Sequence, residues 1–397
     1  MQDTTLSIII AGDVVPSNRT ELLFSLGDIE SLLGKELVKI FSSADIASIN
    51  LECPLTNSTQ PLEKRGPNLK AVPETIRGIK ALNPSVVGLA NNHIMDFGET
   101  GLSDTIEVLE QEGLAYVGVG KNVQDAAQSI HIVAKNDLRI GFYACTEHEF
   151  SIATSTKAGA NPFDPLITGD TIALLKASNR IDVMIILYHG GKEYYQYPSP
   201  DLQKTCRHLV EKGADLVVCQ HSHCIGAYEH YLHGDIVYGQ GNFLFDMNNP
   251  ISRESLLLSY TLNKEKESNL SFLPIKRNEL QGGGGTISLA EGVEGQEILD
   301  AFISRSKEIL EHGSIERHFE EYSESLLNIY LSKLSPFGKI YSKMNKYLFR
   351  GRLFNWLYPK EKLFTLLNFI ECEAHREVLN KGLSSRARDS EQKKSMT

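Results

Sequence analysis

The stretch Leu6–Asp13, with the sequence LSIIIAGD, sets the pattern for the first half of the chain. Its apolar residues are continuous, which is typical of a strand buried on both faces of a mainly parallel sheet. The strand ends in a glycine followed by a carboxylate. An apolar strand, a polar or glycine-rich exit and a helical stretch then recur as far as about residue 240. This alternation predicts a layered α/β fold with right-handed crossovers.

Further strands and helices can be placed by the same criteria. The clearest helix is Pro200–Lys212, which Ser199 can cap and Gly213 can end. Pro73 opens a second helix, and Glu99–Glu112 forms a third. The segments that fit the strand pattern are Leu6–Ala11, Asp45–Ile49, Ser85–Ala90, Arg139–Ala144, Asp182–Leu187, Asp215–Cys219 and Asp235–Tyr238.

The composition is that of an ordinary globular protein. The chain has 397 residues, 41% of them hydrophobic, and a formal net charge of −10. This negative charge argues against a nucleic-acid partner, which would need a concentrated basic surface. The six cysteines show no C-x-x-C spacing and indicate free thiols in a reducing compartment. With no signal peptide and no apolar run near the ~20 residues of a transmembrane segment, we expect a cytoplasmic protein.

The character of the sequence changes after Phe245. Ser255–Leu262 and Leu270–Ile275 resemble strands that close the fold, and a glycine-rich break follows at residues 281–285. We therefore expect a first domain at residues 1–285.

A helical region is expected at residues 286–380, followed by a disordered polar tail at residues 381–397. The aromatic residues of the helical region favour a packed cap or a dimer face. Tyr341–Tyr358 is also rich in Lys and Arg, so peripheral contact with a membrane is an alternative.

Polar side chains follow nearly every predicted strand. In chain order the strand exits carry Asp13, Asn50 with Glu52, Asn91 with Asn92, His93 and Asp96, Glu147 with His148, His189 with Glu193, His221 with His223, and Asn242. Ligands of open parallel sheets bind outside the carboxyl ends of the strands. We therefore expect these residues, which are far apart in the sequence, to meet at one edge of one sheet.

This mixture of side chains suits a divalent cation. Carboxylates supply negative charge, neutral imidazoles supply nitrogen donors, and an asparagine carbonyl adds a neutral oxygen. Such a set without cysteine favours one or two ions of Mn, Fe, Zn, Co or Mg over a structural zinc site. A bound cation of this kind activates water for hydrolysis.

Each residue taken singly also has a structural interpretation. Asp13 could cap the following segment, Glu52 could be a surface acid, and Asn92 could form a turn. His189 could be a core histidine, and of His221 and His223 one could be exposed and the other a cap. Their shared position at the ends of strands favours the metal site.

Six motifs in a fixed order carry a resemblance to a known family. With them the chain resembles, over about residues 6–275, the CapA family of bacterial poly-γ-glutamate capsule synthesis, within the calcineurin-like metallophosphoesterase superfamily. The motifs are GDVV at residues 12–15, NLECPLT at 50–56, LANNHIMDFG at 89–98, HGGKEY at 189–194, QHSH at 220–223 and YGQGNF at 238–243.

The resemblance implies a layered metallophosphatase-like fold and a role for each matching residue. His93 would stabilise the transition state or protonate the leaving group, and Asp96 would orient it. One position departs from the superfamily: Val15 stands where a histidine ligand is usual. The implied metal ligands are Asp13, Glu52, Asn92, His189, His221 and His223. Residues expected to line the substrate pocket are Arg19, Asn50, Asn91, Glu193, Tyr194 and Asn242.

Two functions are compatible with these features. The first is a metal-dependent hydrolase that cleaves a phosphoester, amide or ester bond during synthesis of a capsule or another cell-surface polymer. The second is a non-catalytic accessory component of polymer assembly or export with a vestigial metal site, which the loss of an imidazole at Val15 favours. Expected partners are an anionic polymer, a phosphorylated or γ-glutamyl substrate and other capsule-synthesis proteins. Arg19, Lys64 and Arg65 could meet anionic groups of such a substrate.

Overall fold

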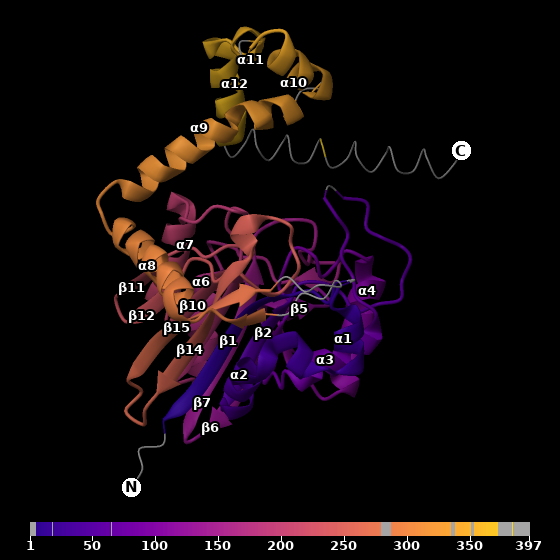
Figure 1. The fold of residues 1–397 in the computed structure, drawn as a ribbon, viewed down its shortest axis with the longest axis vertical. Helices are drawn as coiled ribbons and strands as arrows, with labels where there is room; N and C mark the ends of the chain where they lie inside the picture. The colour runs from indigo at the N-terminus through magenta and orange to yellow at the C-terminus, as the bar shows by residue number, and fades with distance from the viewer. Residues whose placement is uncertain are drawn as a thin grey trace. The chain divides into compact units, whose positions relative to one another are not determined.

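The computed structural model describes residues 5–17, 19–64, 66–278, 287–334, 338–350, 353–371 and residue 383. The chain divides into two compact units, the first ending at Phe319 and the second beginning at Glu320. The first unit contains two β-sheets and the helices that cover them (Figure 1).

The first sheet contains the amino-terminal strands. Its order is β16-β15-β14-β1-β2-β3-β4, and β13 pairs with the end of β1. The strands β1 to β4 and β13 run parallel, whereas β14 to β16 are antiparallel. The bounds are β1 (Leu6–Val14), β2 (Ile46–Leu51), β3 (Val86–Gly88), β4 (Tyr116–Val117), β13 (Asn242–Leu244), β14 (Glu254–Leu262), β15 (Ser268–Arg277) and β16 (Ile287–Leu289).

The second sheet has the order β11-β12-β10-β9-β7-β6, with antiparallel strands at both edges. A small separate pair joins β5 (Val119–Gly120) to β8 (Gly159–Ala160). The bounds of the second sheet are β6 (Ile130–Lys135), β7 (Leu138–Thr146), β9 (Val183–His189), β10 (Leu216–Gln220), β11 (Tyr228–Tyr231) and β12 (Gly234–Val237).

The expectation of a single sheet was wrong. The predicted strands are present, but the first three belong to one sheet and the next four to the other. Continuous apolar runs indicate strands buried on both faces, and strands in either of two stacked sheets meet that condition. The run length therefore identifies a strand without identifying its sheet.

Three apolar cores show how the layers stack. Ile8 and Leu258 of the first sheet pack with Phe142 and Ile185 of the second, so the two sheets face each other. Helices cover the outer face of each sheet. The fold is therefore layered α/β, and further helices follow the last strand in the sequence, as predicted. The helices of the first unit are α1 (Glu21–Leu26), α2 (Ile29–Ser43), α3 (Ile76–Ala81) after the short turn η1 (Pro73–Thr75), α4 (Gly98–Gln111), α5 (Val123–Ala127), α6 (Thr168–Ser178), α7 (Pro200–Glu211) and α8 (Gly292–Glu308). Of these, α8 contributes Ile298 and Phe302 to the core between the two sheets.

The outer cores assign these helices to faces. Phe24 of α1 and Leu37 of α2 pack with Ile49 of the first sheet. Leu202 and Leu209 of α7 pack under the second sheet. The predicted cap of α7 is confirmed, because Ser199 Oγ accepts a hydrogen bond from the Leu202 backbone N–H at 3.1 Å.

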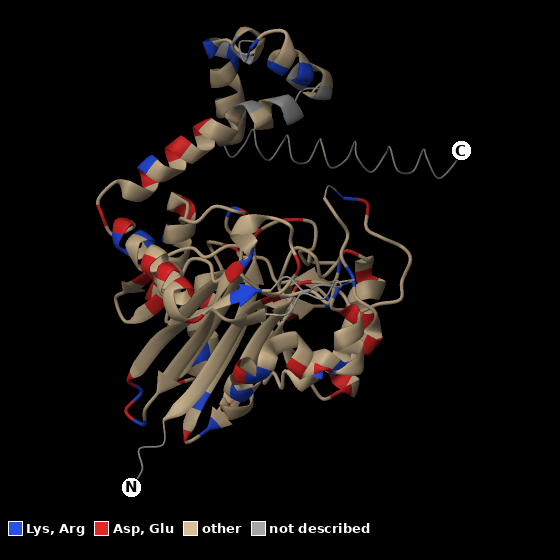
Figure 2. Cartoon of the chain, in the orientation of Figure 1, with Lys and Arg blue, Asp and Glu red and all other residues tan. Residues whose placement is uncertain are grey.

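Charged residues lie mainly on the helices and loops, and the strands of the sheets are largely uncharged (Figure 2). This distribution agrees with strands buried between layers. Among the residues that the structure describes, no helix combines the length and apolar character needed to span a bilayer.

The boundary between the two units lies within α9 (Ser314–Leu334), beyond the expected boundary at residue 285. The first unit therefore includes β16 and α8. The second unit contains α10 (Gly338–Tyr347), α11 (Leu353–Leu357) and α12 (Lys360–Glu371). The predicted glycine-rich break at residues 281–285 and the tail at 381–397 lie outside the described residues, apart from residue 383.

Helix α8 is an integral part of the first unit because its apolar side packs against the β-sheets. Phe302 is 1% exposed, and its ring lies 4.7 Å from that of Phe272 on β15. We expect Phe302→Ala to lower the free energy of unfolding by about 3–5 kcal/mol, as for other large apolar side chains removed from a core. The neighbouring Ile303 is 44% exposed, so Ile303→Ala should cost about 1 kcal/mol or less. Urea unfolding of both variants tests this, and equal losses would contradict it.

Candidate metal centre

The candidate site lies where the carboxyl ends of strands from both sheets converge. Asp13 is on β1, and Glu52 directly follows β2. His189 is the last residue of β9, and His221 and His223 follow β10. The site is therefore assembled from two sheets, and the expectation that one sheet edge gathers it is corrected.

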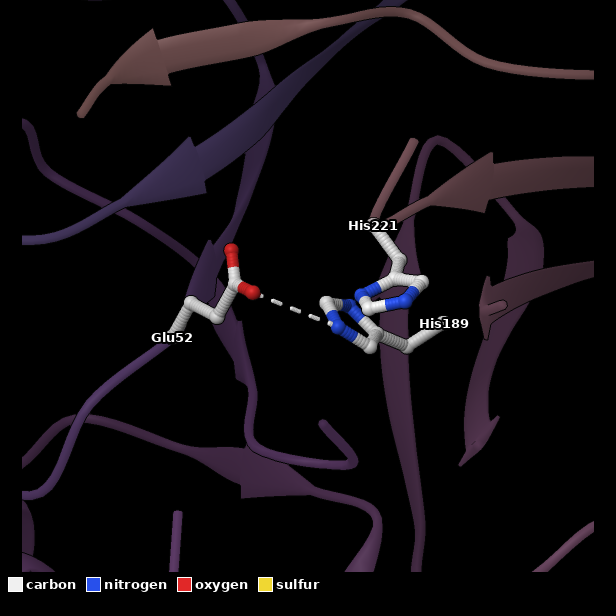
Figure 3. Close-up of side chains that lie close together, drawn as sticks. All are labelled: Glu52, His189 and His221. Carbon is white, nitrogen blue, oxygen red and sulfur yellow. Dashed lines mark ion pairs between the residues drawn. The ribbon is translucent and has the colours of Figure 1, made fainter. Parts of the chain in front are cut away.

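Glu52, His189 and His221 form the first close group. Their potential ligand atoms all lie within 4.8 Å of one another. His189 Nε2 is 3.4 Å from Glu52 Oε1, and the rings of His189 and His221 are 4.8 Å apart. In Figure 3 the Glu52 carboxylate points toward the two imidazoles, which approach it from another part of the chain. All three side chains are buried.

A second group joins Glu52 to Asp13 and His223, again with ligand atoms within 4.8 Å. His223 Nδ1 lies 3.5 Å from Asp13 Oδ2, and His223 Nε2 lies 4.0 Å from Glu52 Oε1. Asn92 closes the cluster from the loop after β3, because its Oδ1 is 3.0 Å from His189 Nε2. The structure thus brings together the six residues that the sequence analysis placed at a common point.

Glu52 supplies a direct test of whether these residues fit a cation. Its side chain is 0% exposed, yet neither carboxylate oxygen accepts a hydrogen bond from the described residues. Burial raises the pKa of Glu52 well above its usual value, and the charge of Asp13 raises it further. A buried carboxylate without hydrogen-bond donors is costly unless a cation meets it. The carboxylate and imidazole donors around it are suitable ligands for a divalent ion, so these clusters could hold metal ions.

Two of the imidazoles, those of His189 and His221, are in the neutral form that binds metal. Burial lowers the pKa of His189 to about 3 and that of His221 well below its usual value, so both rings are neutral near pH 7. Burial alone would also lower the pKa of His223, but its hydrogen bond with Asp13 and the charge there raise it. In turn, His223 and His189 hold the pKa of Asp13 below its usual value despite the opposing effect of burial. Asp13 is therefore ionised over the whole physiological range.

Three buried asparagines hold the cluster in place. Asn50 Nδ2 donates to Asp13 Oδ1 at 2.8 Å and lies 3.3 Å from His189 Nδ1. Asn91 Nδ2 donates to the Leu51 carbonyl at 2.8 Å. Asn242 Oδ1 is 2.9 Å from His223 Nδ1. These contacts orient the proposed ligands, and outer contacts of this kind set ring orientation at metal sites.

His93 lies beside the cluster and is held by a buried ion pair. His93 Nδ1 is 2.6 Å from Asp96 Oδ2, as expected for an orienting carboxylate. The other oxygen of Asp96 forms an ion pair with Lys64, whose side chain is 2% exposed. Because Nδ1 donates to Asp96, Nε2 is the nitrogen of His93 that remains to exchange a proton with a bound molecule. The sequence analysis considered Lys64 for anion binding but missed its pairing with Asp96.

Other predicted residues differ in their placement. Arg19 is exposed in the turn before α1, and Arg65 lies outside the described residues. Tyr194 is half-buried, with its ring 6.1 Å from that of His223. Glu193, expected from the sequence to line the substrate pocket, joins His221 and His223 in a third close group, so it is also a potential ligand, a role that the sequence analysis did not assign. The spacing of His189 and Glu193 in the HGGKEY motif gives no indication that Glu193 binds metal.

Comparisons with known proteins agree with these observations. The family profile "Bacterial capsule synthesis protein PGA_cap" matches residues 7–247. A capsule biosynthesis protein CapA from Bacillus anthracis is 27% identical over 70% of this chain and 69% of its own length. A PGA biosynthesis protein CapA from Bacillus subtilis is 28% identical over 70% of this chain and 73% of its own length.

Among solved structures, a 5'-nucleotidase precursor from Thermus thermophilus superposes with a TM-score of 0.44 at 14% identity. The match covers 75% of this chain and 58% of that chain.

Proposed function

Because the chain belongs to the bacterial capsule synthesis protein family PGA_cap, we propose that it is a metal-dependent hydrolase acting in the synthesis of a capsule or a related cell-surface polymer. The family resemblance of its motifs is thereby confirmed. The bond cleaved would be a phosphoester, or an amide or ester, of the polymer or its precursor.

A single observation supports the metal dependence most strongly: the buried carboxylate of Glu52 lacks hydrogen-bond partners among the described residues and stands beside His189 and His221, which are both neutral near pH 7. A site built for structure alone would pair both oxygens of a buried carboxylate with donors. Leaving them unpaired costs stability in the absence of a cation. A destabilising group of this kind is expected at a functional site, where the carboxylate of Glu52 would serve to bind a cation.

The proposed ligands are Asp13, Glu52, Asn92, His189, His221 and His223. When bound, a divalent cation there supplies Lewis acidity and lowers the pKa of coordinated water. Asn50 orients Asp13 and His189 through its side-chain amide. Asn242 orients the ring of His223. These asparagines, proposed from the sequence as substrate contacts, are better placed to orient the ligands.

His93 is proposed as the general acid. Its Nδ1 donates to Asp96, which fixes the ring and leaves Nε2 to deliver a proton to the leaving group. Lys64 neutralises Asp96 from the other side. Asp96 and Lys64 are therefore proposed as positioning residues that keep the His93 ring in one orientation.

The substrate is proposed to be a polyanion. Relatives of this chain are named for capsule and PGA biosynthesis, and one from Mycobacterium tuberculosis is named a probable polyglutamine synthesis accessory protein. A phosphorylated or γ-glutamyl group suits a cationic metal centre. The chain is proposed to act in the cytoplasm with other capsule-synthesis proteins as partners. The free, buried thiols of five described cysteines agree with a reducing compartment.

The accessory role remains the second candidate because Val15 offers no donor to the site. The Val15 side chain is 3% exposed and packs in the apolar core beside the first sheet. In an accessory protein the cation would support binding or stability, and the chain would bind the polymer without cleaving it.

Hydrolysis assays separate the two candidates. Purified protein loaded with Mn(II) should cleave a phosphodiester such as bis-p-nitrophenyl phosphate or a γ-glutamyl anilide, and His93→Gln should reduce the rate by about 100-fold or more while the metal content stays unchanged. The exposed His312 provides the matched control, and His312→Gln should leave the rate unaltered. Metal-loaded protein that binds polyglutamate but cleaves none of these substrates would favour the accessory role.

A further inference from the structure

Glu193 belongs to a loop that is fastened to the loop carrying His221 and His223. The Gly190 backbone N–H donates to the Gln220 carbonyl at 3.0 Å, and the Tyr194 N–H donates to the Ser222 carbonyl at 2.8 Å. One bond precedes Glu193 in the chain and the other follows it. The main chain on both sides of Glu193 is therefore fixed relative to the two histidines.

Backbone strain concentrates in these two loops. Tyr194, His221 and His223 have φ angles of +62°, +89° and +54°, a region that non-glycine residues rarely occupy. Such a backbone conformation is strained in a non-glycine residue and persists only where surrounding contacts enforce it. The result of this strain is that Glu193, His221 and His223 place potential ligand atoms within 4.8 Å of one another.

This third group overlaps the two groups around Glu52. His221 is shared with the group of Glu52 and His189, and His223 is shared with the group of Asp13 and Glu52. The three groups together contain three carboxylates and three imidazoles. A single cation with four to six ligands does not need all of them together with Asn92, so the cluster holds enough donors for a second, adjacent cation.

Residue 15 contributes nothing to either position. Val15 is buried in an apolar core, and its backbone N–H donates to the Leu244 carbonyl at 2.9 Å. Glu193 enters from a different loop and from the second sheet. It supplies a charged oxygen donor on the side of the cluster formed by His221 and His223.

We propose that Glu193 is a ligand of a second divalent cation, held together with His221 and His223 beside the first. The inference rests on the proposed metal centre and adds a position to it. A carboxylate and two imidazoles favour Mn, Fe, Co or Zn over Mg. Because Glu193 is partly exposed whereas the other members are buried, this position faces solvent and is the weaker of the two.

Metal stoichiometry tests the proposal without an activity assay. Apo protein is titrated with Mn(II) in a calorimeter, and Mn(II) retained after gel filtration is measured by elemental analysis. The wild-type chain should bind two equivalents with separable affinities. Glu193→Gln should weaken the second by about 100-fold or more, beyond the loss expected for residues that only orient ligands, and leave the first within about threefold. Glu193→Asp should restore part of the loss.

The neighbouring Lys192 is exposed, so Lys192→Gln is the matched control and should retain both equivalents. Electron paramagnetic resonance supplies an independent readout, because the spin-coupled pair signal of two Mn(II) ions should disappear in Glu193→Gln. Thermal unfolding in EDTA should be the same for wild type and variant, which establishes that the variant is folded.

Each result decides between distinct ideas. Two equivalents in Glu193→Gln, or a single equivalent that is the same in wild type and variant, would overturn the second position while leaving the metal centre intact. A wild-type chain that binds no Mn(II) would overturn both the inference and the proposed metal-dependent function.

Discussion

Asp13→Asn should reduce divalent-metal affinity by about 100-fold or more and abolish any metal-dependent hydrolysis. Changes in residues that merely orient metal ligands already cost about 10–100-fold in affinity or activity. The loss of a charged ligand should reach or exceed the upper end of that range. Equilibrium dialysis with Mn(II), followed by elemental analysis, measures the effect directly.

The size of the effect follows from the number of contacts that Asp13 makes. It accepts a hydrogen bond from Asn50 and lies 3.5 Å from His223 Nδ1. The asparagine is close in shape, but it carries no charge and cannot accept on both oxygens. His223 and Asn50 would thus lose the group that orients them, in addition to the direct loss of a ligand.

A matched control separates this local effect from a general loss of negative charge. The side chain of Asp201 on α7 is 94% exposed, so Asp201→Asn changes the same charge far from any buried contact. It should retain the metal affinity of the wild type. If Asp13→Asn binds Mn(II) as tightly as Asp201→Asn does, Asp13 is not a ligand.

The second large effect concerns Glu52. Its substitution should raise the free energy of unfolding in the absence of metal and lower it relative to the wild type when metal is bound. In chelated protein, Glu52→Gln should stabilise the fold near neutral pH because it removes a buried carboxylate that lacks hydrogen bonds. With Mn(II) at about 1,000 times its dissociation constant, the wild type should gain about 4 kcal/mol that the variant lacks. Urea unfolding with EDTA and with Mn(II) measures both differences.

The same pair of proteins has a defined pH dependence in EDTA. The folded pKa of Glu52 is raised above its ordinary value of 4.5, mainly by burial. From pH 4.5 upward the folded state therefore holds a proton that the unfolded state releases. Stability from this group is present below pH 4.5 and is lost as pH rises toward the folded pKa, at up to about 1.4 kcal/mol per pH unit. Glu52→Gln should remove this slope, and parallel curves for the two proteins would contradict the prediction.

Much of the first unit could be predicted because its strands and helices are determined by residues that are close together in the sequence. Apolar runs such as Asp182–Leu187 are strands in the structure, and the polar residues that follow them are the ones that converge. The predicted helix Pro200–Lys212 is present with its serine cap because propensity and capping act over a few residues. In each case neighbouring residues alone carry the information.

The features that were missed depend on contacts between distant segments. Nothing within Arg139–Ala144 tells whether that strand pairs with β1 or with β9, so the two sheets were taken as one. Glu193 reaches His221 only because two loops are joined by backbone hydrogen bonds and Tyr194 adopts a positive φ. Lys64 meets Asp96 from an irregular segment without periodicity. Such contacts leave no local pattern.

The division of the centre between two stacked sheets has a consequence for remote substitutions. Asp13 and Glu52 lie on or directly after strands of one sheet, and His189 and His221 lie on or directly after strands of the other. The distances between these ligand atoms therefore depend on how the two sheets are aligned. A slip of a single residue along a strand is about 3.3 Å, more than a coordination bond tolerates. The apolar interface of Ile8, Phe142 and Leu258 acts as the spacer that sets this alignment. Substitutions that change the packing of this interface should therefore change the affinity for metal, although none of the three side chains contacts the ion.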